Sequence, residues 1–109
     1  MRLEQYDKAL LLCNRSLNLK ASYAPTYSIR AMVLEYKGSL DEARSDYDQA
    51  IRLQPENWGL FHSRGEFLER HGDDVGAKAD LETVYRMSPD WVETRSPFSD
   101  AFARYSIGK

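Results

Sequence analysis

The chain repeats itself with a period of 34 residues, and this repetition constrains the fold more than any other feature. Residues 24–57 match residues 58–91 after a shift of one period. A period of this size is typical of solenoids, in which copies of one small unit stack and share a core. Identical residues stand at Arg30/Arg64, Leu34/Leu68, Glu35/Glu69, Gly38/Gly72, Ala43/Ala77, Asp46/Asp80, Arg52/Arg86 and Pro55/Pro89.

Each copy is predicted to be a hairpin of two helices. In the first copy, Tyr27, Ala31 and Leu34 fall at i, i+4 and i+7, which is a helical spacing. Gly38 then provides a residue that readily takes the left-handed conformation at a helix end. A second amphipathic segment follows and stops before Pro55, because proline lacks the N–H that a helix interior needs. The second copy follows the same plan.

This order of aromatic, small, glycine, alanine and closing proline positions resembles the tetratricopeptide repeat. The resemblance covers residues 24–91 as two full units. It implies an all-α fold, a right-handed α-solenoid of antiparallel helix hairpins. Leu81 and Val84 depart from the pattern, since the family more often has an aromatic residue and an alanine at these positions.

Partial units are expected on both sides of the two copies. Residues 1–20 align with the second helix of a unit, without the first helix. Either the chain is a fragment of a longer array, or something else covers this helix. After the second copy, Phe98, Ala101, Phe102 and Tyr105 form an apolar stripe that predicts a closing helix over 97–106.

We therefore expect one tetratricopeptide-like domain over residues 1–109, made of about two and a half units and a C-terminal capping helix within residues 92–109.

The most informative polar residues are two pairs that recur with the repeat: Arg30 with Asp46, and Arg64 with Asp80. Each pair joins the two helices of one hairpin, so we interpret both as structural ion pairs that fix the helix register.

A second face of the first helices points about 130° away from the packing stripe, given 100° per residue. The resemblance implies that this face lines a concave groove for partner peptides. The chaperone-binding members of the family hold a C-terminal carboxylate there with Lys and Asn, but this chain has Ser28, Met32, His62 and Glu66, so that clamp is not expected. The alternative is an ordinary solvent-exposed face. The groove would be lined by Ser28, Met32, Glu35 and Tyr36 in the first copy and His62, Glu66, Glu69 and Arg70 in the second.

The leading functional hypothesis is a protein–protein interaction scaffold that holds a partner protein or peptide, with a basic partner favoured by the three glutamates. The second hypothesis is a self-associating or inter-domain assembly module, in which the unpaired helix within residues 3–19 docks against another copy, as a homo-oligomer, or against another domain. It rests on Leu3, Tyr6, Leu10 and Leu17, which lack a partner hairpin.

Other classes of function find little support in the sequence. The net charge of -2 does not favour nucleic acid as a partner. Two histidines and scattered acidic residues match no metal-ligand spacing, and Cys13 occupies a packing position. We therefore expect no enzymatic activity, no metal and no cofactor. Without a signal or an apolar run long enough to span a membrane, we expect no membrane contact and a cytoplasmic location.

Overall fold

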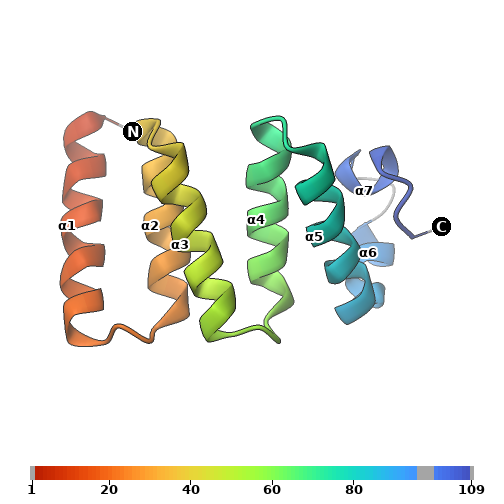
Figure 1. Ribbon diagram of the computed structural model, residues 1–109, viewed down its shortest axis with the longest axis horizontal. Helices are drawn as coiled ribbons and strands as arrows, with labels where there is room; N and C mark the ends of the chain where they lie inside the picture. The colour runs from red at the N-terminus through yellow and green to blue at the C-terminus, as the bar shows by residue number, and fades with distance from the viewer. Residues whose placement is uncertain (1, 96–99, 109) are drawn as a thin grey trace. The chain divides into compact units, whose positions relative to one another are not determined.

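The computed structural model describes residues 2–95 and 100–108, and within these ranges the chain is helical with no strand (Figure 1). This confirms the all-α helical repeat fold. The chain divides into two compact units, residues 1–56 and 57–109, each described here by itself. The helices are α1 (Leu3–Leu19), α2 (Ala24–Lys37) and α3 (Leu40–Leu53) in the first unit, and α4 (Trp58–Arg70), α5 (Asp74–Met87), α6 (Pro89–Arg95) and α7 (Asp100–Arg104) in the second.

In the first unit, α2 packs between α1 and α3. Small residues allow α2 and α3 to approach closely, since Ala31, Ala43 and Ala50 are all completely buried. Tyr47 fills the space beside them and is 2% exposed. The helices meet through the stripe of small and apolar residues that the repeat pattern predicts.

In the second unit, α4 and α5 form the corresponding hairpin, and α6 packs against α5. One buried cluster of this unit consists of Leu81, Val84, Val92 and Phe102, which come from α5, α6 and α7. Aromatic side chains of α4 and α6 surround the core, and the rings of Trp58 and Trp91 lie 4.6 Å apart between centroids. The C-terminal helices therefore close the hydrophobic core of the second hairpin.

Residues at the helix ends explain where each element begins and stops. Gly38 and Gly72 have φ angles of 87° and 84°, the left-handed conformation that favours glycine. The side chains of Asn57 and Asp73 accept hydrogen bonds from the backbone N–H groups of Gly59 and Gly76, which caps α4 and α5.

The end of the chain forms two short helices. Helix α6 begins at Pro89, a residue suited to the first turn of a helix, and α7 lies within the closing helix expected over 97–106. Residues 96–99, including the predicted start of the closing helix and Phe98, lie outside the described residues. The expected stripe is present in α7 and after it, because Phe102 is 2% exposed and Ala101 and Tyr105 pack against the same core.

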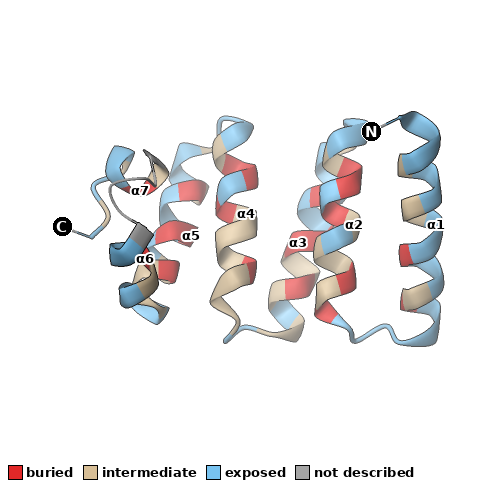
Figure 2. Cartoon of the chain, turned by 180° about the vertical axis from the view of Figure 1, so that it is seen from behind, coloured by how far each residue is buried: buried red, intermediate tan, exposed pale blue. Residues whose placement is uncertain are grey.

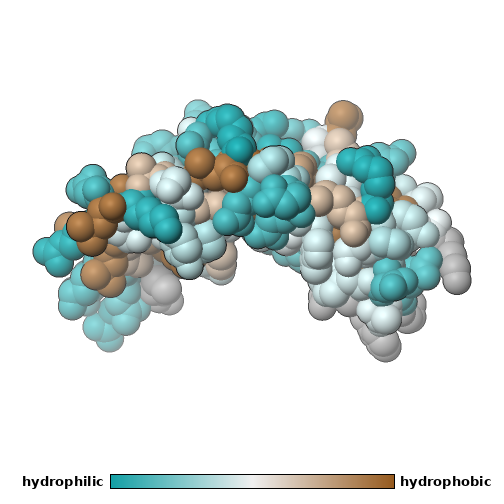
Figure 3. Space-filling view, turned by 90° about the horizontal axis from the view of Figure 1, so that it is seen from below, coloured by the Kyte–Doolittle hydropathy of each residue, from teal (hydrophilic) through white to brown (hydrophobic). Residues whose placement is uncertain are grey.

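Helix α1 is covered on the side that faces α2 (Figure 2). Cys13 and Leu17 are buried there, and Tyr6 and Leu10 are half-buried. Tyr6, Leu10 and Leu17 were expected to lack a partner hairpin, and in the structure they pack on the side of α1 that faces α2, a helix of the next repeat. Other leucines of α1 are exposed to solvent: Leu3, Leu11, Leu12 and Leu19. Hydrophobic surface is visible over α1 (Figure 3).

In the described part of the chain, none of the helices combines the length and the hydropathy that crossing a bilayer requires.

Candidate functional site

The first recurring ion pair joins α2 to α3. Arg30 donates from Nε to Asp46 Oδ2 at 2.7 Å and from Nη2 to Asp46 Oδ1 at 2.8 Å. Its remaining nitrogen, Nη1, donates to Asn14 Oδ1 of α1 at 2.9 Å. The hydrogen bond with Asp46 is the main reason that the pKa of Arg30 is raised above its ordinary value. The guanidinium therefore stays charged and links all three helices of the unit.

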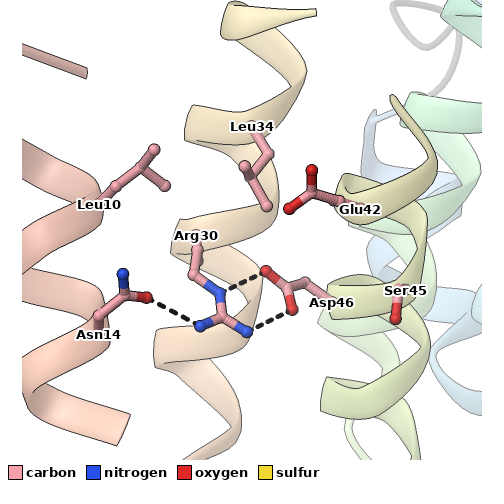
Figure 4. Close-up of a pocket in the computed structure, with 7 residues that line it drawn as sticks. All are labelled: Leu10, Asn14, Arg30, Leu34, Glu42, Ser45 and Asp46. Carbon is pink, nitrogen blue, oxygen red and sulfur yellow. Dashed lines mark hydrogen bonds and ion pairs between the residues drawn. The ribbon is translucent and has the colours of Figure 1, made fainter. Parts of the chain in front are cut away.

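A cavity of about 350 Å³ opens above this ion pair, between the three helices (Figure 4). Three of its polar lining residues, Arg30, Asp46 and Asn14, are already hydrogen-bonded to one another. We therefore assign this cavity no ligand and interpret it as the space around a structural ion pair. Its lining residues are Leu10, Asn14, Arg30, Leu34, Glu42, Ser45 and Asp46.

The second unit repeats the ion pair between α4 and α5. Arg64 donates from Nε and Nη2 to the two carboxylate oxygens of Asp80, at 2.8 and 2.7 Å. The helices come close beside it, because a Cβ added at Gly65 would lie 3.2 Å from Asp80 Cβ and from Leu81 Cδ2. Both arginines thus sit next to the small residue at the helix crossing.

The outer face of α2 carries an exposed apolar stripe. Ile29, Met32 and Tyr36 are 53%, 45% and 65% exposed, and their spacing of three and four residues places them on one side of the helix. Tyr36 also stacks on Tyr6 of α1, with ring centroids 5.9 Å apart. Ser28 and Glu35, the other two expected groove residues of this unit, lie half-buried on the same helix. The first unit therefore presents an apolar surface with a polar edge.

Two of the expected groove residues of α4, His62 and Glu69, contact side chains of the C-terminal helices. The ring of His62 stacks on Phe102 at 6.3 Å and meets Trp91 edge-on at 4.9 Å. His62 is therefore half-buried against these two rings. Its Nδ1 lies 3.6 Å from the carboxylate of Glu66, which is itself exposed.

Glu69 is also engaged by the end of the chain. Arg104 Nη1 of α7 lies 2.9 Å from Glu69 Oε2, a charge pair that lacks the alignment of a hydrogen bond. Next to it, the Tyr105 hydroxyl donates to Asp74 at 2.9 Å. Of the four residues expected in this copy, Glu66 and Arg70 are exposed, whereas His62 and Glu69 are half-buried.

The comparison with known families decides what kind of unit the first hairpin is. The tetratricopeptide repeat model matches residues 24–57, which comprise α2 and α3 with the following turn. The chain contains a tetratricopeptide repeat. A search of curated proteins found no match to the whole sequence.

The tetratricopeptide repeat is generally a protein-interaction unit without enzymatic activity, so its presence indicates a protein partner. The stripe on α2 is an exposed apolar face of this repeat. Sequence reasoning selected Met32 and Tyr36 but missed Ile29, which stands three residues before Met32 and seven before Tyr36. That helical spacing is visible in the sequence and would have identified Ile29 as part of the same stripe.

Chemically reactive groups are sparse around the repeat. The Cys13 thiol is 7% exposed, and burial raises its pKa, opposed in part by the charge of Arg30. Among residues 2–95 and 100–108, no three His, Cys, Asp or Glu side chains come together in a group that could hold a metal ion.

Proposed function

We propose that this chain is an interaction module that holds a segment of a partner protein against the outer face of α2. The observation that carries the proposal is the exposed apolar stripe of Ile29, Met32 and Tyr36 within the tetratricopeptide repeat. Apolar side chains exposed in a row on one helix face are suited to a protein contact, since a partner that covers them removes apolar area from water.

Tyr36 and Met32 suit this role for different physical reasons. A tyrosine ring offers a large contact area with little conformational entropy to lose, and Tyr36 is already stacked on Tyr6. The methionine side chain is flexible and polarisable, so it can adapt to partners of different shape. Together they favour a partner segment with apolar anchor residues.

The contacts that the glutamates make in the structure weaken the case for a basic partner, which rested on the number of glutamates in the sequence. Three glutamates led to that expectation, but Glu69 is paired with Arg104 and Glu66 lies near His62. Glu35 lies half-buried on α2 and has interactions of its own. We therefore propose apolar anchor residues as the main requirement for a partner.

The proposed site differs from the chaperone-type carboxylate clamp. Ser28 and Met32 occupy the positions where that clamp has Lys and Asn, and neither side chain carries the positive charge that would hold a carboxylate. A partner is therefore expected to bind through side chains along its length and not through its C-terminal carboxylate.

A peptide-display selection against the immobilised chain tests this function. Selected peptides should share apolar residues at a regular spacing, and their affinity should fall about tenfold or more for Met32→Asp, because a charge would then face an apolar anchor. Lys78→Asp on exposed α5 is the matched control and should leave affinity unchanged. Peptides that bind both variants equally well would contradict the proposed site.

A further inference from the structure

The three side chains of the stripe on α2 follow one another at helical intervals. Ile29 precedes Met32 by three residues, and Met32 precedes Tyr36 by four. At a rise of about 1.5 Å per residue, these intervals are about 4.5 and 6 Å along the helix axis, and the stripe is about 10 Å long. Alternating steps of three and four residues are also the spacing with which one helix presents apolar residues to another.

An extended partner segment would match these positions poorly. Its side chains alternate between two faces, so those on one face recur only every two residues, or about 6.6 Å. Within the length of the stripe, an extended segment therefore sets two anchors against three exposed side chains. A helix offers three anchors over the same length, at the same intervals as Ile29, Met32 and Tyr36.

The polar groups around the stripe favour the same conformation. Helix α2 contains neither Asn nor Gln, the side chains that can both donate to and accept from the backbone of an extended segment. Lys37 donates to Asp7 at 2.7 Å, and Arg30 is bonded to Asp46 and to Asn14. Peptide groups pressed against the stripe would therefore lose water without gaining a partner, whereas a helix bonds its own backbone internally.

We infer, on the basis of the proposed function, that the partner segment binds α2 as an amphipathic α-helix. Its contact face has apolar residues at i, i+3 or i+4, and i+7. That face is also uncharged, because the stripe carries no charge and Lys37 beside Tyr36 is already paired with Asp7. A charged residue set against Ile29 or Met32 would be desolvated without a counter-charge.

Tyr6 continues the apolar surface from α2 onto α1. Its ring lies almost parallel to that of Tyr36, at an interplanar angle of 5°. Leu3 precedes Tyr6 by three residues, on the same side of α1, and is 64% exposed. The surface is therefore broadest around Tyr36, and the largest anchor of the partner helix should lie opposite this residue.

A peptide obtained by the display selection described above, synthesised in three forms, tests this conformation. One form is linear, and one has a lactam bridge between positions four apart on the side away from its apolar residues. The third has a proline at a central position on that side. Isothermal titration calorimetry measures the affinity of each form for the intact chain, and ¹³C chemical shifts of the labelled linear peptide report its bound conformation.

The bridged form should bind about threefold or more tightly than the linear one, because less conformational entropy is lost on binding. The proline form should bind at least about tenfold more weakly, since proline disrupts a helix interior. The matched control for the bridge is the same peptide with both bridging side chains present but not joined. It should bind as the linear form does.

The outcomes separate this inference from the proposed function. If Met32→Asp weakens binding but the bound peptide has extended ¹³C shifts, or if the proline form binds as tightly as the linear form, the helical conformation is wrong and the site on α2 stands. If Met32→Asp leaves binding unchanged while circular dichroism shows the fold intact, the site and the inference are both wrong.

Discussion

Arg64 and Asp80 form a bidentate ion pair between α4 and α5, with N–O distances of 2.8 and 2.7 Å, and the Asp80 side chain is only 5% exposed. Arg30 and Asp46 make the same two bonds between α2 and α3. A buried ion pair is weak evidence of net stabilisation, because both charges lose water. Its specific geometry does fix the relative register of the two helices, since only one alignment lets both nitrogens reach both oxygens.

Removing one member of this pair should destabilise the protein strongly. Arg64→Ala leaves the buried Asp80 carboxylate without its partner, so we expect a loss of about 3 kcal/mol in the free energy of unfolding. Urea denaturation followed by circular dichroism measures this loss. Lys78→Ala, an exposed change on the same hairpin, should cost less than about 0.5 kcal/mol. Equal stability of the two variants would show that the ion pair contributes nothing.

The close crossing of α4 and α5 should not tolerate a larger side chain. Gly65→Leu places several carbons where Asp80 Cβ and Leu81 already lie 3.2 Å from a Cβ position. We expect a loss of roughly 1–3 kcal/mol from overpacking, despite the better helix propensity of leucine. Thermal denaturation of this variant beside Glu82→Leu, at an exposed site on α5, measures the effect. A variant as stable as Glu82→Leu would mean that the helices are farther apart than the structure shows.

The C-terminal helices should act mainly through apolar packing. Phe102 is 2% exposed in the core of the second unit, so Phe102→Ala should cost about 3–4 kcal/mol. The Arg104 side chain is 56% exposed, and its pair with Glu69 should contribute less than about 1 kcal/mol. Chemical denaturation of Phe102→Ala and Arg104→Ala compares the two contributions. The reverse order would indicate that charge, and not burial, holds α7 in place.

The Cys13 thiol should react slowly. Its pKa is raised, chiefly by burial, so less of it is thiolate near neutral pH than in an unfolded chain. The rate of labelling by Ellman's reagent should therefore rise sharply when urea unfolds the protein. The raised pKa also means that folding favours the protonated thiol, so stability should decline as the pH rises through the alkaline range above the ordinary thiol pKa. Cys13→Ala should reduce this decline, and the part that remains is attributed to Tyr85 and Tyr105, whose pKa values are also raised in the folded chain.

The hairpins were predictable because their signals are local and occur twice. The left-handed glycines, the closing prolines and the small residues at the crossings all follow from backbone geometry that neighbouring residues determine. The ion pairs could be predicted for a related reason, because the spacing of Arg30 and Asp46 recurs one period later in Arg64 and Asp80.

The candidate site was harder to predict because it depends on which faces other helices cover. His62 and Glu69 of α4 correspond to Ser28 and Glu35 of α2 after a shift of one period. The repeat therefore predicts that the two helices contribute to the same groove. Phe102, Trp91 and Arg104 change that environment in the second unit, and they belong to a segment that does not follow the repeat. The contact between α1 and α2 was not predicted either, because it joins a partial unit to the complete unit that follows it.

The central claim is that the outer face of α2 holds the partner, and amide chemical-shift mapping tests it most directly. A ¹⁵N-labelled chain would be titrated with a peptide obtained by display selection, and the shifts of α2 and α4 would be compared. Our account predicts that the largest changes lie around Ile29, Met32 and Tyr36, with small changes around His62 and Glu69. Changes concentrated on α4, with α2 unaffected, would contradict it.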